Sequence, residues 1–210
     1  MIILGVETTC DETAAAVVKD GHEILSNVVA SQIDLHAAFG GVVPEVAARS
    51  HIEVMLPVID SALDKAGIEI EQIDGIAVAY GPGLIGSLLI GNLTARTLAQ
   101  ILKKPLYLVN HVEAHTYASF LDGKKPQFPL LSLTVSGGHT QLVLFTDQGR
   151  YKILGRTHDD AVGEAFDKVA KILGLPYPGG PSVAKAAEKG DSNAYKLPMP
   201  NLGKGSLDFS

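Results

Sequence analysis

The chain opens with the stretch Ile2-Ile3-Leu4-Gly5-Val6-Glu7-Thr8-Thr9-Cys10-Asp11-Glu12-Thr13-Ala14-Ala15-Ala16-Val17-Val18, in which two apolar runs flank a short polar turn. Runs of β-branched and small apolar residues on either side of such a turn are typical of paired strands. A third run, Ile24 to Ala30, follows closely. Residues 2–30 therefore predict a three-stranded antiparallel meander. Pro44 is suited to the first turn of a helix, and Gly67 to its end, so residues 44–66 predict a long helix.

The same order of elements returns later in the chain. Residues 130–135, 141–145 and 151–157 read as strands around a polar turn, and 160–173 as a helix. Between the copies lie a strand at 73–80, a helix at 84–102 and a strand at 105–109, which alternate as a parallel-sheet unit requires. In a duplicated fold the order of strands and helices is expected to repeat even where the residues of the two copies differ. We therefore expect an α/β fold with two related halves, at 1–123 and 124–210, the second of them incomplete.

Composition excludes several classes of protein. The chain has 210 residues, of which 46% are hydrophobic and 19% charged, as in ordinary globular proteins. The single cysteine, Cys10, excludes a disulfide framework and fits a reducing compartment. No signal peptide is recognisable, and no apolar run is expected to approach the ~20 residues of a membrane span. The net charge of −6 argues against broad nonspecific binding of nucleic acid, although Lys103-Lys104 and Lys124-Lys125 leave local basic patches open.

Two glycines interrupt the helix predicted at 84–102. Gly86 and Gly91 would each be unfavourable in a helix interior without a packing reason. We expect them to permit the close approach of a neighbouring backbone.

The run Asn110-His111-Val112-Glu113-Ala114-His115 follows the strand at 105–109, where a helix is expected to begin. Two histidines four residues apart lie on one face of a helix, a spacing that lets two imidazoles reach one metal ion. The alternative is a plain helix N-terminus with Asn110 as its cap. Glu113 points away from the histidine face, so the run differs from the zinc-protease pattern, in which a glutamate beside the first histidine is the base.

The two polar turns predict a nucleotide site. Residues 136–138, Ser-Gly-Gly, let backbone N–H groups approach an anion, and glycine there would permit positive φ. The hydroxyls of Thr134 and Thr140 flank this turn. In the first copy, Asp11 and Glu12 could hold a magnesium-phosphate group or orient water. The alternative is that Ser-Gly-Gly is an ordinary tight turn.

The last predicted helix carries two pairs of opposite charge at i,i+4 spacing, Glu164–Lys168 and Asp167–Lys171. Helix spacing by itself favours a solvated ion pair for Asp167. Residues 178–181, Pro-Gly-Gly-Pro, introduce another short helix, whose free N–H groups could serve a ligand, although a plain turn is the alternative.

Taken together, these residues resemble the Gcp/TsaD family. The matching stretches are Gly5 to Thr13, Gly40 to Glu45, Gly81 to Leu84, the Asn110 to His115 run, Ser136 to Thr140 and Asp159 to Gly180. The family was formerly described as O-sialoglycoprotein endopeptidases and is understood as the catalytic subunit that makes threonylcarbamoyladenosine in tRNA. The resemblance implies the duplicated actin-like ATPase/sugar-kinase fold, in agreement with the repeat.

The resemblance also implies roles for individual residues. It assigns a divalent metal, Fe2+ or Zn2+, to His111 and His115. It gives Asp11 and Glu12 as catalytic residues that line the same cleft. Its substrate-binding positions, for ATP or threonylcarbamoyl-AMP with Mg2+, are Thr134, Val135, Ser136, Gly137, Gly138, Asp167 and Gly180. For Asp167 it implies contact with ribose hydroxyls instead of the ion pair.

The activity implied is transfer of threonylcarbamoyl from threonylcarbamoyl-AMP to the exocyclic amine of the adenosine 3′ of the anticodon. The implied partners are tRNA, a smaller paralogous subunit and an ATPase subunit, in the cytoplasm and without a membrane. Family members are longer than this chain and supply a third metal ligand, an Asp, and a nucleotide-contacting Asn from the part absent here. We therefore expect an amino-terminal fragment that is inactive alone.

Three other functions can be weighed on the residues themselves. A metalloprotease would use the histidine pair, but Glu113 faces away from the histidines and no other base is evident nearby. A small-molecule kinase of the same fold would use the nucleotide turns, but it has no need for the histidine pair. A non-catalytic scaffold would bind partners through the helices at 44–66 and 84–102. An assay for adenylate-dependent tRNA modification separates the enzyme from all three.

Overall fold

Strands β1 (Ile2–Glu7), β2 (Glu12–Lys19) and β3 (Glu23–Ser31) form the predicted antiparallel meander in a computed structural model of the protein. The structure describes residues 1–121, 123, 125–200 and 202–210. The candidate basic patch at Lys124-Lys125 therefore lies partly outside the described residues. The chain divides into two units, Met1–Lys125 and Pro126–Ser210, each with its own sheet.

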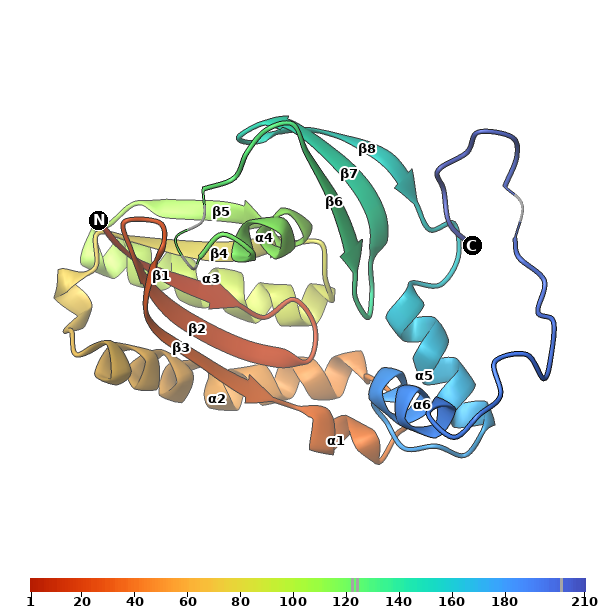
Figure 1. Ribbon diagram of the computed structural model, residues 1–210. Coiled ribbons are helices and arrows are strands. Elements are labelled where there is room, and N and C mark those ends of the chain that lie inside the picture. Colours follow the sequence, from red (N-terminus) through yellow and green to blue (C-terminus); the bar gives the residue numbers. More distant parts are fainter. Residues whose placement is uncertain (122, 124, 201) are drawn as a thin grey trace. The chain divides into compact units, whose positions relative to one another are not determined.

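The sheet of the first unit has five strands in the order β3-β2-β1-β4-β5. Strands β4 (Gly75–Gly81) and β5 (Leu106–Asn110) run parallel to β1, so the sheet is mixed. Helices α2 (Pro44–Ala66) and α3 (Ile85–Leu102) pack beside each other on the sheet (Figure 1). The remaining elements are short: α1 (Ile33–Ala37), the 3-10 turn η1 (Ile70–Gln72) and α4 (His111–Ala118). Of these, α1 and η1 were not predicted, because neither is long enough to show a helical period.

The core of the first unit lies between its sheet and the two long helices. Alternate residues of β1 and β2 face inward, as a strand requires, and α2 and α3 contribute residues at helical spacing. The fully buried members include Leu4, Val17, Met55, Ile59, Ile76 and Ala95. This continuous apolar layer holds the polar turns at the strand ends in place.

Helix α3 approaches its neighbours through small residues. A side chain at Gly91 would overlap the hydroxyl of Thr8, and one at Gly86 would lie 3.0 Å from Ala48 Cβ. Both glycines thus permit a close approach, but the prediction of a neighbouring backbone is wrong, because the neighbouring atoms belong to side chains.

Helix α3 also has the length and hydropathy of a membrane-crossing helix, with a mean hydropathy of 1.2 over 18 residues. The expectation that no apolar run approaches that length was therefore too strict. Its four buried residues, Ser87, Gly91, Ala95 and Ala99, recur every four positions and face the unit's interior. A helix that packs on a sheet satisfies the same criteria of length and composition.

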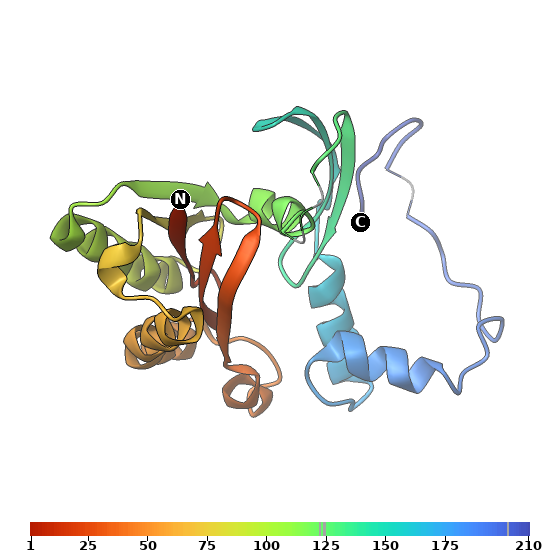
Figure 2. The ribbon, with the colours of Figure 1, turned by 60° about the vertical axis from the view of Figure 1, so that its left-hand side comes forward.

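The second unit contains three antiparallel strands, β6 (Leu130–Val135), β7 (Thr140–Asp147) and β8 (Arg150–Arg156). Two helices follow, α5 (Val162–Ile172) and α6 (Gly179–Ala187), which pack against each other (Figure 2). Near the last residues, Phe209 forms a parallel bridge with Thr157 just beyond β8. Strand, polar turn, strand, strand and helix thus recur in both units. This confirms the predicted α/β fold with two related units, of which the second has three strands where the first has five.

Candidate active site

The parallel arrangement of β1, β4 and β5 brings the ends of three strands to one edge of the first sheet. Glu7 ends β1, Gly81 ends β4, and Asn110 ends β5. Because β4 lies between β1 and β5, the carboxyl ends of these strands meet at that edge. The β1–β2 turn and the start of α4 are therefore neighbours, although about a hundred residues separate them.

Asn110 caps α4. Its side-chain oxygen accepts hydrogen bonds from the N–H groups of Val112, at 2.9 Å, and Glu113, at 3.2 Å. The capping alternative in the sequence is therefore correct, and it is compatible with a site on the same helix. The cap fixes the first turn, from which His111 projects.

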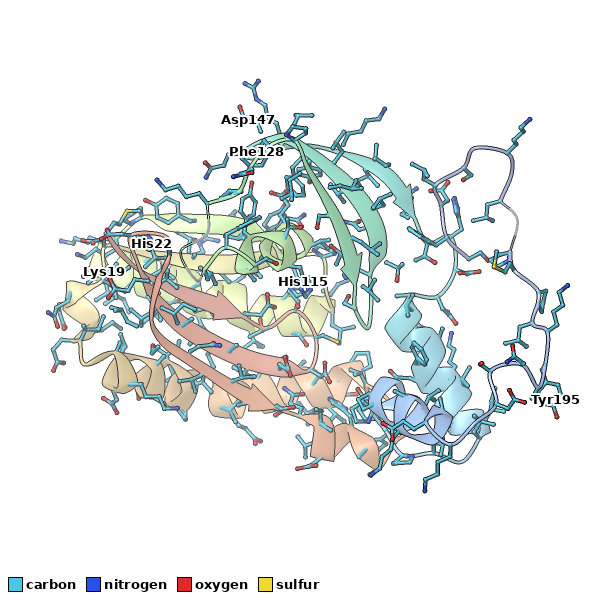
Figure 3. All side chains as sticks on the ribbon, in the orientation of Figure 1. Lys19, His22, His115, Phe128, Asp147 and Tyr195 are labelled. Carbon is cyan, nitrogen blue, oxygen red and sulfur yellow. The ribbon has the colours of Figure 1, made fainter. Side chains whose placement is uncertain are left out.

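The two histidines of α4 converge (His115 is labelled in Figure 3). Their Nε2 atoms lie 3.1 Å apart, and their rings meet edge to face with centroids at 4.6 Å. Two nitrogens that bind one zinc-like ion at ~2.0–2.1 Å in tetrahedral geometry are about 3.3 Å apart. The pair therefore has nearly the separation that one shared metal ion requires.

A carboxylate supports the first of these histidines. His111 Nδ1 donates to Glu7 Oε2 at 2.9 Å, and Thr9 Oγ1 lies 3.3 Å from the same nitrogen. The other Glu7 oxygen accepts from the Thr9 backbone N–H. A metal-binding histidine usually donates its second ring N–H to such a group, which orients the ring and leaves the other nitrogen for the metal.

Sequence reasoning missed Glu7 because its distance from the histidine along the chain hides the contact. The only signal was its place as the first carboxylate after a buried strand, at the edge where parallel strands end. Several other polar residues also follow buried strands, so this position by itself does not identify Glu7.

The protonation states favour metal binding. Burial opposes ionisation of Glu7, but hydrogen bonds from His111 and Thr9 outweigh it, so the pKa of Glu7 is lowered. Burial, and then the charge of His111, lower the pKa of His115. A histidine binds a metal ion in its neutral form, so the lowered pKa of His115 favours metal binding.

The chemistry of these side chains fits a divalent metal held by two protein ligands. In the part of the chain that the structure describes, no group of three or more His, Cys, Asp or Glu side chains is arranged to hold an ion. Two imidazoles leave coordination positions for substrate, water or a further ligand. Asp11 and Glu12 lie in the same turn as Thr9, with Asp11 half-buried and Glu12 exposed at the start of β2. Their catalytic role stays a prediction.

The Ser-Gly-Gly turn of the second unit joins β6 to β7. Ser136 and His139 close it, with the Ser136 N–H donating to the His139 carbonyl at 2.8 Å. The prediction of positive φ at this turn is wrong, because neither Gly137 nor Gly138 has a positive φ. No described atom lies within 4 Å of a side chain built at either position. The glycines therefore leave the turn open without being required by its conformation.

Helix α5 begins against this turn. The Gly163 N–H donates to the Ser136 carbonyl at 3.1 Å, and a side chain at Gly163 would lie 2.7 Å from Gly137 Cα. Thr134 is buried and Val135 is half exposed, because successive strand residues face opposite ways. Their side chains cannot both face one ligand.

Asp167 bonds to the start of α6. Its Oδ1 accepts from the Gly179 N–H at 2.7 Å. The ion pair with Lys171 that helix spacing predicted is not found between these two described residues. The companion prediction is confirmed: Lys168 Nζ lies 3.1 Å from Glu164. A helix N-terminus attracts an acidic side chain, and local spacing cannot reveal which one. Gly180 follows with no described atom within 4 Å of a side chain built there. Contact of Asp167 and Gly180 with a nucleotide stays a prediction.

Comparison with known proteins identifies the family. The family described as TsaD, tRNA N6-adenosine threonylcarbamoyltransferase, matches residues 23–210. The chain belongs to the TsaD family. A tRNA N6-adenosine threonylcarbamoyltransferase of Protochlamydia amoebophila is 57% identical over 211 residues, and one of Thermomicrobium roseum is 56% identical over 216. All of this chain is covered, but only 62% and 59% of those TsaD relatives, so it spans about three-fifths of their length.

Solved structures with similar elements share little sequence with this TsaD chain. YeaZ from Pseudomonas aeruginosa is 18% identical with a TM-score of 0.47, covering 73% of this chain and 65% of its own. The (R)-2-hydroxyglutaryl-CoA dehydratase component A of Acidaminococcus fermentans is 13% identical with a TM-score of 0.49, covering 91% and 70%. The resemblance to TsaD found in the sequence is thus confirmed by the family match, whereas the individual site residues stay predictions.

Proposed function

We propose that the protein transfers a threonylcarbamoyl group from threonylcarbamoyl-AMP to the exocyclic amine of the adenosine 3′ of the anticodon in tRNA. The observation that carries the proposal is the converging pair His111 and His115, oriented by Glu7. The membership of the chain in the TsaD family supplies the reaction class.

His111 and His115 would hold Fe2+ or Zn2+ through their Nε2 atoms. Such an ion, when bound, supplies a Lewis acid for the carbamoyl oxygen. Glu7 keeps the His111 ring fixed, with its Nδ1 protonated and its Nε2 directed towards that of His115, so that the ligand is oriented before the ion arrives. In the reaction a bond forms between the amine nitrogen and the carbamoyl carbon, and the bond from that carbon to the phosphate oxygen breaks. AMP leaves with the electron pair.

The amine must lose a proton when it attacks. Asp11 and Glu12 are the carboxylates of the β1–β2 turn, and we assign them the roles of accepting this proton or holding Mg2+ beside a phosphate. Nucleotide binding, of ATP or threonylcarbamoyl-AMP, falls to Thr134, Val135, Ser136, Gly137, Gly138, Asp167 and Gly180. Much of the rate enhancement would come from orientation of the two substrates.

Partner proteins and tRNA complete the proposal. Helices α2 and α3 expose apolar side chains, of which Ile52, Leu56, Ile85, Leu89 and Leu93 are each more than half exposed. An exposed apolar surface of this kind suits a protein partner, and we assign it to the smaller paralogous subunit. An ATPase subunit would be the third component. We assign the protein to the cytoplasm, and a tRNA substrate and the single free cysteine, Cys10, support this assignment.

A chimera tests the proposal. This chain replaces the matched 211 residues of the Protochlamydia relative, and the product is assayed with its partner proteins, ATP, threonine, bicarbonate and unmodified tRNA. Mass spectrometry of the digested tRNA should show threonylcarbamoyladenosine. The His111→Ala and His115→Ala variants should each lose the activity and the bound metal while remaining folded. The matched control is His22→Ala, which removes an exposed histidine from the turn after β2.

Full activity and stoichiometric metal in the double histidine variant would refute the assignment of the site. Peptide hydrolysis without tRNA modification would instead favour the metalloprotease.

A further inference from the structure

Three consecutive carbonyls of the β1–β2 turn are each held by a different part of the first unit. The Thr9 carbonyl accepts from the Leu84 N–H at 2.8 Å, and the Asp11 carbonyl accepts from the Gln32 N–H at 3.1 Å. Between them, the Cys10 carbonyl accepts from two side chains, His51 Nε2 at 3.0 Å and Ser87 Oγ at 3.2 Å. The backbone of the turn is therefore positioned from outside it.

His51 is the least expected of these groups. It lies on α2 among the core residues and is 0% exposed. Thr13 Oγ1 lies 2.7 Å from its Nδ1. Because Nε2 must carry the proton to donate to the Cys10 carbonyl, Nδ1 must accept from the Thr13 hydroxyl. Burial lowers the pKa of His51, despite the nearby charges of Asp11 and Glu7, and so favours this neutral tautomer.

The contacts of His51 continue to a second buried histidine. Gln32 Nε2 lies 3.4 Å from His51 Nδ1, and Gln32 Oε1 lies 3.2 Å from His36 Nε2. His36 is 0% exposed, and its Nδ1 accepts from the Val43 N–H at 3.3 Å. A line of buried polar groups thus runs from the start of α2 to the turn. A polar network of this kind holds a unique geometry only while every member is satisfied.

We propose that His51 is a positioning residue for the candidate active site. By holding the Cys10 carbonyl, it keeps the adjoining Thr9 where the Thr9 N–H reaches Glu7 and the Thr9 hydroxyl reaches His111. His51 therefore acts on the His111 ring through the turn without touching substrate. The inference rests on the proposed function only in that His111 is taken to belong to the active site. The contacts between His51, the turn and His111 do not depend on that function.

The competing explanation is that His51 contributes only to stability. A buried, hydrogen-bonded side chain costs stability when it is removed, whatever lies beyond it. The experiment therefore needs a readout at His111 that a general loss of stability does not move.

The readout is the His111 Nδ1 proton in the metal-free 210-residue protein, labelled with 15N-histidine and followed by NMR. In the wild type this proton is hydrogen-bonded to Glu7 and should exchange slowly with solvent. In His51→Leu the turn loses one bond at Cys10, and we expect exchange at His111 to quicken by about tenfold or more. His51→Gln can still donate to that carbonyl and should restore slow exchange.

Two further variants keep the test decisive. Thr13→Val removes only the hydroxyl that fixes the His51 tautomer. It should therefore also quicken exchange at His111, but by less than His51→Leu does. If His51→Leu does not fold, Thr13→Val tests the proposal in its place. Val58→Ala truncates a core residue two turns along the same helix and is the control for lost stability. It should leave the His111 signal unchanged. Unaltered exchange at His111 in the folded Leu and Val variants would overturn the proposal.

Titration with Co2+ supplies a second arm. If the wild-type protein binds the ion, the Leu variant should bind it about tenfold more weakly, as is usual when an outer-shell contact to a metal ligand is lost. If the wild-type protein binds no Co2+, the proposed metal site fails, and the NMR arm still decides the role of His51.

Discussion

Gly179 lies where α6 begins against α5, and the packing there leaves no room for a side chain. An added Cβ would overlap the Phe166 carbonyl and lie 2.5 Å from Asp167 Cα. The same close approach lets the Gly179 N–H reach the Asp167 carboxylate. Gly179 thus permits the close packing of the two helices at this point.

Gly179→Ala should destabilise the protein by about 1–3 kcal/mol, the usual cost of overpacking. The measurement is urea unfolding followed by circular dichroism. Gly180→Ala is the matched control, because it makes the same change one residue on, where no described atom lies within 4 Å. Equal losses in the two variants would show that packing against α5 is not the cause.

His51 also predicts how stability depends on pH. Its pKa in the folded protein is lowered from an ordinary value of 6.5, so between these two values the unfolded chain binds more protons than the folded one. The contribution of His51 to the free energy of unfolding is therefore complete above about pH 6.5. It is lost as the pH falls through the folded pKa.

Urea unfolding at pH 8, 6.5 and 5.5 measures this dependence. The loss of stability between pH 8 and 5.5 should be smaller in His51→Gln than in the wild type. His22→Gln, which replaces an exposed histidine outside the buried network, should keep the wild-type profile. A His51→Gln profile parallel to that of the wild type would contradict the prediction.

At the scale of elements, α4 depends on its cap. The helix has eight residues, and isolated helices of this length are unstable in water. Asn110 satisfies two N–H groups of its first turn, from which His111 projects. The stability of the cap and the geometry of the histidine pair are therefore linked.

Asn110→Ala should cost about 1 kcal/mol of stability, as is typical for the loss of an N-cap. It should also weaken Co2+ binding at the histidine pair, because the first turn of α4 frays. Asn110→Asp keeps an acceptor at the same place and should behave nearly as the wild type. Unfolding curves and Co2+ titrations on the three proteins check this. Weak Co2+ binding in Asn110→Asp, with wild-type stability, would point to another role for the amide.

At the scale of the whole molecule, the apolar core is unevenly shared. The main cluster of buried apolar residues lies entirely in the first unit. In the second unit, Leu131, Leu133 and Val135 follow one another on the same face of β6, and each is more than half exposed. These residues form a contiguous apolar surface.

Residues 1–125 should therefore fold by themselves and unfold cooperatively on heating. Residues 126–210 produced separately should bind a hydrophobic dye and self-associate, because their sheet exposes apolar side chains. Calorimetry, dye fluorescence and sedimentation of the two pieces provide the measurements. A first unit without a cooperative transition would mean that it needs the second to fold.

The sequence by itself determined the order of the elements, because strand and helix periods, glycine and proline are local signals. Residues 2–30 predicted the antiparallel meander, and the spacing of His111 and His115 predicted their common face. The recurrence of the same order in 130–173 predicted the second unit, for the same reason.

Tertiary structure alone decided which polar groups meet. Glu7 contacts His111 because β4 is inserted between β1 and β5, so that distant strand ends share one edge. Asp167 bonds to Gly179 and not in the way that helix spacing suggested, because α6 turns back onto α5. His51 reaches Cys10 because α2 packs across β2, the strand that follows the turn, and β3. Periodicity specifies which face of an element is buried. The element that packs against that face is set by the path of the chain between distant strands and helices, and no local sequence pattern shows that path.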